Sequence, residues 1–330
     1  MANLTFIRIL AGAASGLLFA SATTGALFAL PLFYLTPLPL FLVGLGWGTV
    51  SVAIAGVAGS LLATLFLGGL VGLGYLVTFA IPATILTYLA LLCRQPSGQP
   101  AGAAGSADVS QLEWYPPGKL VAWITVMAGA LTALAIPLLG LDAQTYYGNL
   151  QEIMENTLLK DLEAAAPEGF DKQQMTEVIG FLARALPALS AAIWMLAMVF
   201  NMWAAGRILG YAGHSLRPWP DISKMSYPRE FAIGFVASLI GSLLPGILSI
   251  MAVGFAGAFV MAYVLLGLVV IHALSRLSPL RPFILFSVYI GLIFFGWIAL
   301  IVATIGMADP IFNLRERFSA NRPPPAPGAE

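Results

Sequence analysis

The polar side chains that could do chemistry are few, and most of them lie at the ends of long apolar segments. Asp309 precedes Arg315 by six residues just after the last apolar segment, a spacing that predicts a charge-assisted pair at the end of a helix. Asn201 and Arg207 lie near the end of an earlier segment, where an asparagine amide can form a hydrogen bond between helices. His272 ends another segment, and we interpret it as a packing residue in preference to a proton relay.

The residue types that most enzymes need do not form any common catalytic pattern. The two histidines, His214 and His272, are far apart, and the sequence contains no HExxH motif, nucleophile elbow or phosphate-binding loop. The acidic residues between positions 152 and 163 have no convergent partners for acid–base chemistry. The single cysteine, Cys93, excludes an internal disulfide and any cysteine-rich metal site. We therefore expect no enzyme activity, no cofactor and no metal site.

Composition places these residues in a membrane. Of the 330 residues, 59% are hydrophobic and 9% are charged, whereas a soluble domain carries about 25% charged residues. The apolar runs are long and do not alternate, which disfavours an outer-membrane barrel. We therefore predict an all-α polytopic membrane protein with about eight or nine transmembrane helices in the lipid bilayer. The formal net charge of zero gives no indication of a nucleic-acid partner.

Changes in composition divide the chain into parts. Residues 95–117 are rich in Pro, Gly, Ser and Ala, which is typical of a flexible linker. Two polar segments interrupt the second half, and we expect the first to form an amphipathic helix that lies on the membrane or caps the bundle. The predicted parts are a glycine-rich N-terminal membrane half (1–93), the linker (94–118), a C-terminal membrane half (119–308) with the polar segments 142–174 and 212–230, and a Pro-rich tail (309–330).

The apolar pattern also predicts the principal helices. We expect one helix over residues 4–33, a long helix over 175–211 and a single last span over 283–307. Turns are expected at Gly68-Gly69 and near Gly46-Trp47-Gly48.

Positively charged residues predict the orientation in the membrane. Because Lys and Arg near the ends of spans favour the cytoplasm, the 212–230 segment is expected on that side and the acidic 142–174 segment outside. With this orientation, a single last span would leave Arg315, Arg317 and Arg322 outside, which conflicts with the same rule.

One face of the first predicted helix carries small residues at every fourth position: Gly12, Gly16 and Ala20. Two helix backbones can approach closely where side chains are small, and this stabilises helix pairs in lipid. We therefore predict that another helix docks on this face. Either the binding of a partner protein or the stability of the bundle depends on this contact.

Four passages carry a resemblance to a known family. They are Leu186 to Ala188 leading to Asn201 and Arg207, the Pro-rich passage Trp219 to Pro228, Gly267 to His272, and Gly306 to Arg317, in which Asp309 and Arg315 occupy a G-x-x-D-x-x-x-x-x-R pattern. Together they resemble the YybS-like family of bacterial integral membrane proteins, a domain family of unknown function. That family is distantly similar to the substrate-binding subunits of energy-coupling-factor transporters and to a class of cell-shape proteins. The resemblance implies the inner membrane, and a coupling subunit that docks on the small residues of the first helix.

Two functions are consistent with these features. The first is a small-molecule binding or transport subunit, for which the expected partners are a small-molecule ligand and another membrane protein that docks through the first helix. The second is a non-transporting scaffold or an envelope or cell-shape assembly factor. The absence of a charge cluster away from the helix ends favours this second function, because ion-coupled transporters normally carry such charges.

Overall fold

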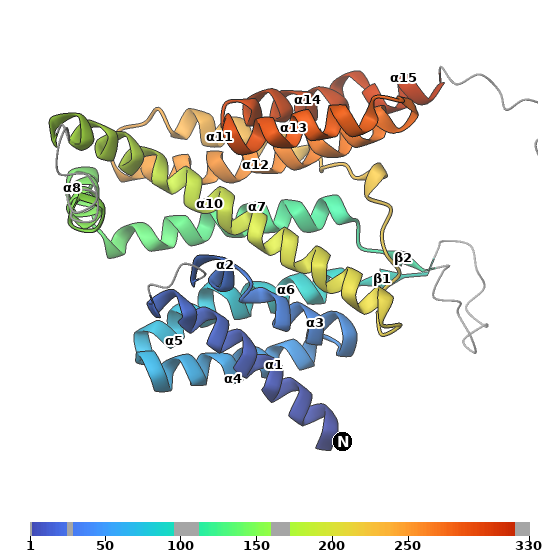
Figure 1. The fold of residues 1–330 in the computed structure, drawn as a ribbon, viewed down its shortest axis with the longest axis horizontal. Helices are drawn as coiled ribbons and strands as arrows, with labels where there is room; N and C mark the ends of the chain where they lie inside the picture. Colours follow the sequence, from blue (N-terminus) through green and yellow to red (C-terminus); the bar gives the residue numbers. More distant parts are fainter. Residues whose placement is uncertain (1, 25–28, 96–111, 160–171, 321–330) are drawn as a thin grey trace, which may run out of the picture.

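The computed structural model describes residues 2–24, 29–95, 112–159 and 172–320, and within them it is a helical bundle with one short strand pair (Figure 1). In the described ranges, seven helical stretches are long and apolar enough to cross a membrane, and three shorter apolar helices accompany them. The prediction of an all-α polytopic membrane protein is confirmed.

The N-terminal half is a bundle whose helices are connected by tight turns. Gly48 (φ +91°) separates α3 from α4, and Gly68 (φ +100°) separates α4 from α5, so both predicted turns are confirmed. Glycine adopts these left-handed φ values without a steric penalty. The elements are α1 (Ala2–Ala20), a 3-10 turn (Ser21–Thr24), α2 (Ala29–Tyr34), α3 (Pro37–Trp47), α4 (Thr49–Leu67), α5 (Gly69–Tyr75), a π-helical segment (Leu76–Ala80) and α6 (Ile81–Ala90).

The prediction of one helix over residues 4–33 is wrong. The helix ends at Ala20, and the hydroxyl groups of Ser21 and Thr23 donate hydrogen bonds to the carbonyls of Leu18 and Ala20. Such side-chain bonds compete with the regular helical ladder. The chain resumes as a separate helix, α2, which ends at Tyr34.

Helix α4 of the same chain packs on the small-residue face of α1. A Cβ atom at Gly12 would collide with the carbonyl oxygen of Ala55, and one at Gly16 would lie 3.0 Å from the carbonyl oxygen of Gly59. Both of these α1 glycines are buried, whereas Ala20 at the end of α1 is half-buried. The expectation that a partner subunit docks here is therefore corrected, because α4 already occupies the positions of Gly12 and Gly16.

The two ends of the predicted linker lie side by side. Strand β1 (Cys93–Arg94) pairs antiparallel with β2 (Glu113–Trp114), and Arg94 Nε donates to Glu113 Oε2 at 2.6 Å. Residues 96–111, which make up most of the predicted linker, lie outside the described residues.

Helix α10 (Lys172–Tyr211) connects the two halves. Its 40 residues form one helix about 60 Å long at 1.5 Å per residue. The predicted long helix is confirmed, and it begins three residues earlier than predicted. Figure 1 shows it crossing between the N-terminal helices and the last helices of the chain, and it packs on α3 on one side and on α12 on the other.

Helix α12 (Ile247–Leu274) is the central helix of the C-terminal half. Its glycines allow neighbouring backbones to approach, because a Cβ atom at Gly257 would collide with Ala188 of α10 and one at Gly267 with Val302 of α14. The other elements of this half are α7 (Pro117–Ala135), α8 (Ala143–Met154), α11 (Glu230–Gly241), α13 (Arg281–Phe294), α14 (Ile298–Phe312) and α15 (Leu314–Ala320), with 3-10 turns at Ile136–Leu138, Ile222–Lys224 and Ser275–Leu277 and a π-helical segment at Glu155–Leu159.

The prediction of a single last span over residues 283–307 is wrong, because two helices form a hairpin there. Helices α13 and α14 have 14 and 15 residues, about 21 and 22 Å, which is less than the roughly 30 Å of a bilayer core. Gly296, a poor helix former, lies in the turn that separates them. The hairpin returns the chain to the end of the bundle where α13 begins (Figure 1). It thereby brings Arg315 to the side of the 212–230 segment and removes the conflict in the predicted orientation.

The polar segment 142–174 begins with an amphipathic helix that caps the bundle. The Asp142 carboxylate accepts a hydrogen bond from the backbone N–H of Thr145 at 2.9 Å, which starts α8 as an N-cap. Tyr146 and Leu150 are buried in a small cluster with Ile250 of α12. Figure 1 places α8 at the end of the bundle opposite the strand pair. Residues 160–171 of this segment lie outside the described residues.

Candidate functional site

An arginine ties the 212–230 segment to both halves of the bundle. Arg217 donates through Nη1 to the carbonyl of Ala90 at 3.0 Å and through Nη2 to the carbonyl of Tyr115 at 2.8 Å. Its guanidinium lies over the Trp114 ring, 5.9 Å from the ring centroid. Burial lowers the pKa of Arg217 from its ordinary value, yet an arginine side chain remains charged in proteins. The arginine therefore fixes the loop to the end of α6 and to the end of the linker.

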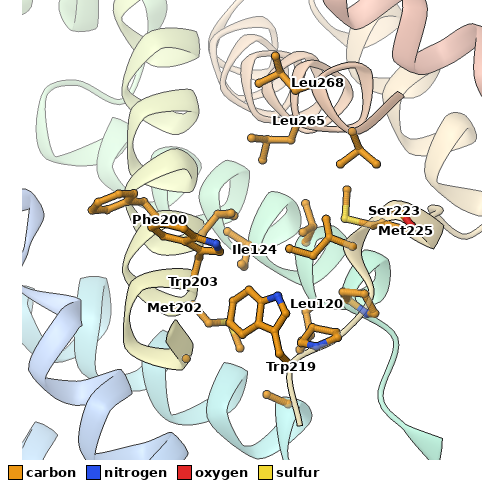
Figure 2. A pocket seen from close by; sticks show the side chains of 18 of the residues that line it. Leu120, Ile124, Phe200, Met202, Trp203, Trp219, Ser223, Met225, Leu265 and Leu268 are labelled. Atoms are coloured by element: carbon orange, nitrogen blue, oxygen red, sulfur yellow. The ribbon is translucent and has the colours of Figure 1, made fainter. Parts of the chain in front are cut away.

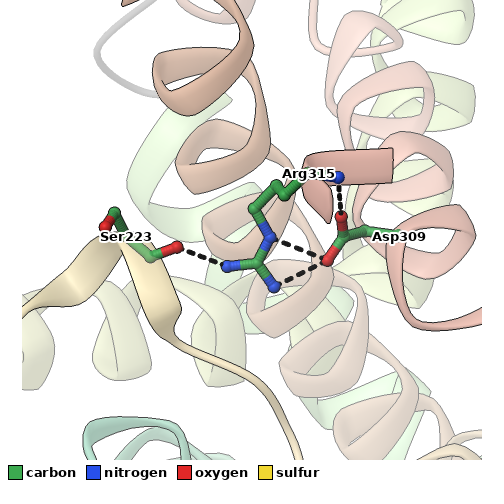
Figure 3. Close-up of polar contacts among 3 residues, drawn as sticks. All are labelled: Ser223, Asp309 and Arg315. Atoms are coloured by element: carbon green, nitrogen blue, oxygen red, sulfur yellow. Dashed lines mark hydrogen bonds and ion pairs between the residues drawn. The ribbon is translucent and has the colours of Figure 1, made fainter. Parts of the chain in front are cut away.

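The tail holds the same segment through a buried ion pair (Figure 3). Arg315 donates to Asp309 Oδ2 through Nη2 at 2.6 Å and through Nε at 2.9 Å, and the two side chains are 19% and 5% exposed. Asn313, with φ +50°, turns the chain between α14 and α15. The predicted charge-assisted pair is present, and Arg315 Nη1 also donates to the carbonyl of Ser223 at 2.6 Å. One arginine therefore joins the end of α14 to the loop.

A pocket of about 850 Å³ lies beneath the 212–230 segment, between α7, α10 and α12 (Figure 2). Its walls are mainly aliphatic and aromatic side chains. They include Leu120 and Ile124 of α7, Phe200, Met202 and Trp203 of α10, Leu265 and Leu268 of α12, and Trp219 and Met225 of the loop. Because Arg217 and Ser223 also line the pocket, the two arginine contacts described above hold one of its walls in place.

The polar side chains of the pocket gather at the end next to the loop. Along α12, the lining residues run from Leu265 and Leu268 to His272 as the helix approaches the loop, and Arg276 of the 3-10 turn that follows α12 continues this row. His272 Nδ1 lies 2.8 Å from the carbonyl oxygen of Leu268, so this nitrogen carries a proton, because a carbonyl oxygen only accepts. His272 Nε2 lies 3.4 Å from the hydroxyl of Tyr289. This pairing fits a packing and positioning role for the histidine.

Asn201 and Arg207, the other two predicted site residues, have separate positions. Asn201 is fully buried, and its Nδ2 donates to the carbonyl of Tyr34 at 2.7 Å, so the predicted hydrogen bond between helices is present. Arg207 is exposed and donates to the hydroxyl of Tyr211 at 2.9 Å. It also lies over the ring of Trp219, 5.6 Å from the centroid, and so packs against a side chain of the pocket wall.

Three of the predicted site residues, Asp309, Arg315 and Arg207, therefore lie at the loop that covers the pocket. The small-residue candidates, Gly12, Gly16 and Ala20, lie in α1 and are not brought to this loop. The pocket is not predicted from the sequence, because its lining comes mainly from three helices and a loop that are far apart in the chain. The one signal available was the concentration of cations and tryptophan in the 212–230 segment. Among the described residues, no three His, Cys, Asp or Glu side chains are grouped as a metal site would require.

Comparison with known proteins identifies the family. A family model described as a predicted membrane protein (DUF2232) matches residues 13–310, which covers nearly the whole bundle. No curated protein and no solved structure matches the chain. The matched region includes α10, the 212–230 loop, the pocket and Asp309. The chain therefore belongs to the DUF2232 family of membrane proteins, whose function is unknown.

Proposed function

We propose that this protein is a small-molecule-binding subunit of the bacterial cytoplasmic membrane, with its ligand in the pocket between α7, α10 and α12. The pocket itself is the observation that carries the proposal. Its volume of about 850 Å³ lies within the range of about 300–1,000 Å³ that is common for ligand sites. Its apolar walls and few polar groups also have the composition of such sites.

The pocket has a position from which a ligand could be taken up or passed on. Its roof is the 212–230 loop, which carries Arg217, Lys224 and Arg229 and is therefore expected at the cytoplasmic surface. The resemblance to substrate-binding subunits of energy-coupling-factor transporters supports a role in transport. A coupling partner would dock on a face other than that of Gly12 and Gly16, because α4 covers them.

We expect a photoreactive dodecanol that carries a diazirine to label the pocket-lining parts of α7, α10 and α12 in purified protein in lipid nanodiscs. The labelling should saturate and should be competed by unlabelled dodecanol, because a defined pocket holds one or a few molecules. The Leu268→Trp variant should lose most of this labelling, because the larger ring takes up space between the pocket walls and obstructs the probe. Peptide mass spectrometry after irradiation measures the extent and the position of the labelling.

Leu248→Trp is the matched control, because Leu248 is 60% exposed and lies on the same helix but does not line the pocket. It should keep the saturable labelling. Equal labelling of the two variants, or labelling that never saturates, would contradict the proposal, because both results describe a probe dissolved in the surrounding lipid.

The alternative function, a membrane scaffold or assembly factor, is favoured by the rigidity of the loop. The loop is fixed by Arg217 to Ala90, by Arg315 to Ser223 and by the hydroxyl of Tyr227, which donates to the carbonyl of Ala262 at 2.6 Å. A loop held at three points presents a constant surface to a partner protein. Affinity purification that recovers envelope-assembly proteins, together with a negative labelling experiment, would favour this function.

A further inference from the structure

We infer that the ligand is an amphiphile with an apolar chain and one anionic head group, and that the head group lies at the loop end of the pocket beside Arg276. This inference rests on the proposed binding function and adds the chemical class of the ligand. It follows from the distribution of polar groups along the pocket.

The polar lining residues of the pocket gather at its loop end. The lining of α10 extends from Leu196 to Gly206, and a second row of lining residues runs from Leu265 of α12 to Arg276 in the 3-10 turn that follows this helix. Either row corresponds to a depth of roughly 15 Å at 1.5 Å per residue. The deep end is apolar, and the polar lining residues lie toward the loop: Ser215, Arg217, Ser223, His272, Arg276 and Tyr289. A pocket with this gradient suits a chain that carries a polar group at one end.

The charge at the loop end is positive. None of the described residues that line the pocket is Asp or Glu, whereas two of them are arginines. Arg276 is exposed on the 3-10 turn that follows α12, and among the described residues it makes neither a hydrogen bond nor an ion pair. The carboxylate near it, Asp221, is exposed and accepts hydrogen bonds from Ser223. The guanidinium of Arg276 is therefore available to an anion.

Three hydrogen-bond donors around the pocket also lack acceptors in the part of the chain that the structure describes. Nε of Arg217 is buried and has no partner there, and the hydrogen bonds of this side chain come from Nη1 and Nη2. The indole N–H groups of Trp203 and Trp219 donate to no acceptor among the described residues, and Figure 2 shows both rings at the pocket. An indole nitrogen can only donate, and an anionic carboxylate or phosphate can only accept. Such a head group complements this end of the pocket in charge and in hydrogen bonding.

The experiment compares three photoreactive probes that share one diazirine-bearing chain and differ in the head group: dodecanoate, dodecyl phosphate and dodecanol. Nanodiscs of phosphatidylcholine keep the bilayer free of net charge. We expect at least one anionic probe to reach half-saturation at a concentration about tenfold lower than dodecanol, the ratio that one charge-assisted hydrogen bond provides. Equal half-saturation for all three probes would overturn the inference and leave the proposed function intact. No saturable labelling by any probe would overturn both.

Arg276→Gln should remove most of the preference for the anionic probe and leave dodecanol labelling unchanged. Arg276→Lys should restore the preference, because it restores the charge. Lys224→Gln is the matched control, since Lys224 is an exposed cation of the 212–230 loop that does not line the pocket. A preference lost equally in Lys224→Gln and Arg276→Gln would overturn the inference, because it would reflect the general surface charge.

A bilayer lipid could supply the same chemistry. Replacing phosphatidylcholine by phosphatidylglycerol in the nanodisc distinguishes the sources. If phosphatidylglycerol suppresses labelling by the anionic probe in the wild type but not in Arg276→Gln, the inference holds and the anionic head belongs to a membrane phospholipid. If labelling by the anionic probe persists, the inference holds and the ligand is a free single-chain amphiphile.

Discussion

The Asp309→Ala variant is expected to unfold at a much lower temperature than the wild type. Asp309 is 4% exposed, and its carboxylate accepts two hydrogen bonds from the Arg315 side chain at 2.6 and 2.9 Å. Removing it leaves the Arg315 guanidinium largely buried without a counterion, which costs about 3–5 kcal/mol. The variant should also loosen the 212–230 loop, since the same guanidinium holds the carbonyl of Ser223. Thermal unfolding in mild detergent measures the first effect, and hydrogen exchange of the loop measures the second.

Glu113→Ala is the matched control for this prediction. It also removes one carboxylate from an arginine pair, Arg94 with Glu113 at 2.6 Å, but the two side chains are 79% and 49% exposed. Exposed pairs contribute about 0–1 kcal/mol, so the midpoint of this variant should lie close to that of the wild type. If Asp309→Ala and Glu113→Ala had the same midpoint, the ion pair at the tail would have no structural role.

The second large effect is expected for Gly267→Leu. A Cβ atom at this position would collide with the carbonyl oxygen of Val302. The facing Gly306 is also in close contact, since a Cβ atom there would be 2.7 Å from the backbone nitrogen of Gly267. Helices α12 and α14 would have to separate, because backbone atoms cannot rotate away as a side chain can. Overpacking a core costs about 1–3 kcal/mol and sometimes more, so we expect little folded protein. The yield of monodisperse protein in size-exclusion chromatography measures this.

Gly210→Leu is the control for the same substitution. Gly210 lies in α10, and a Cβ atom there would meet nothing within 4 Å. Leucine is a better helix former than glycine, so this variant should fold as well as the wild type. A normal yield of Gly267→Leu would show that α14 does not pack against α12 as described.

Local features of the sequence were sufficient to predict much of the fold. Long apolar runs are read directly as membrane helices, and Gly48 and Gly68 marked two turns because few other residues tolerate their φ values. The pair of Asp309 and Arg315 was also local, because six residues separate its members. The C-terminal hairpin was missed because α13 and α14 are both apolar and a single turn at Gly296 divides them. Hydropathy does not distinguish such a pair from one long span.

The pocket could not be predicted because it depends on tertiary packing. The orientation of Trp203, Leu268 and Trp219 toward one space follows from how α10 and α12 cross and from where the loop is fixed. The small-residue face of α1 illustrates the same limit. Its pattern predicts a close helix contact, but only the structure shows that α4 of the same chain makes it with Gly12 and Gly16.

The most direct test of ligand binding is mass spectrometry of the small molecules that copurify with the protein from native membranes in mild detergent. We expect an amphiphile with one anionic head group in a near-stoichiometric amount. It should be present in the wild type and in Leu248→Trp, and it should be lost from Leu268→Trp, in which the larger ring obstructs the pocket. Equal recovery of that amphiphile from both variants, or recovery of partner proteins with no small molecule, would contradict the account.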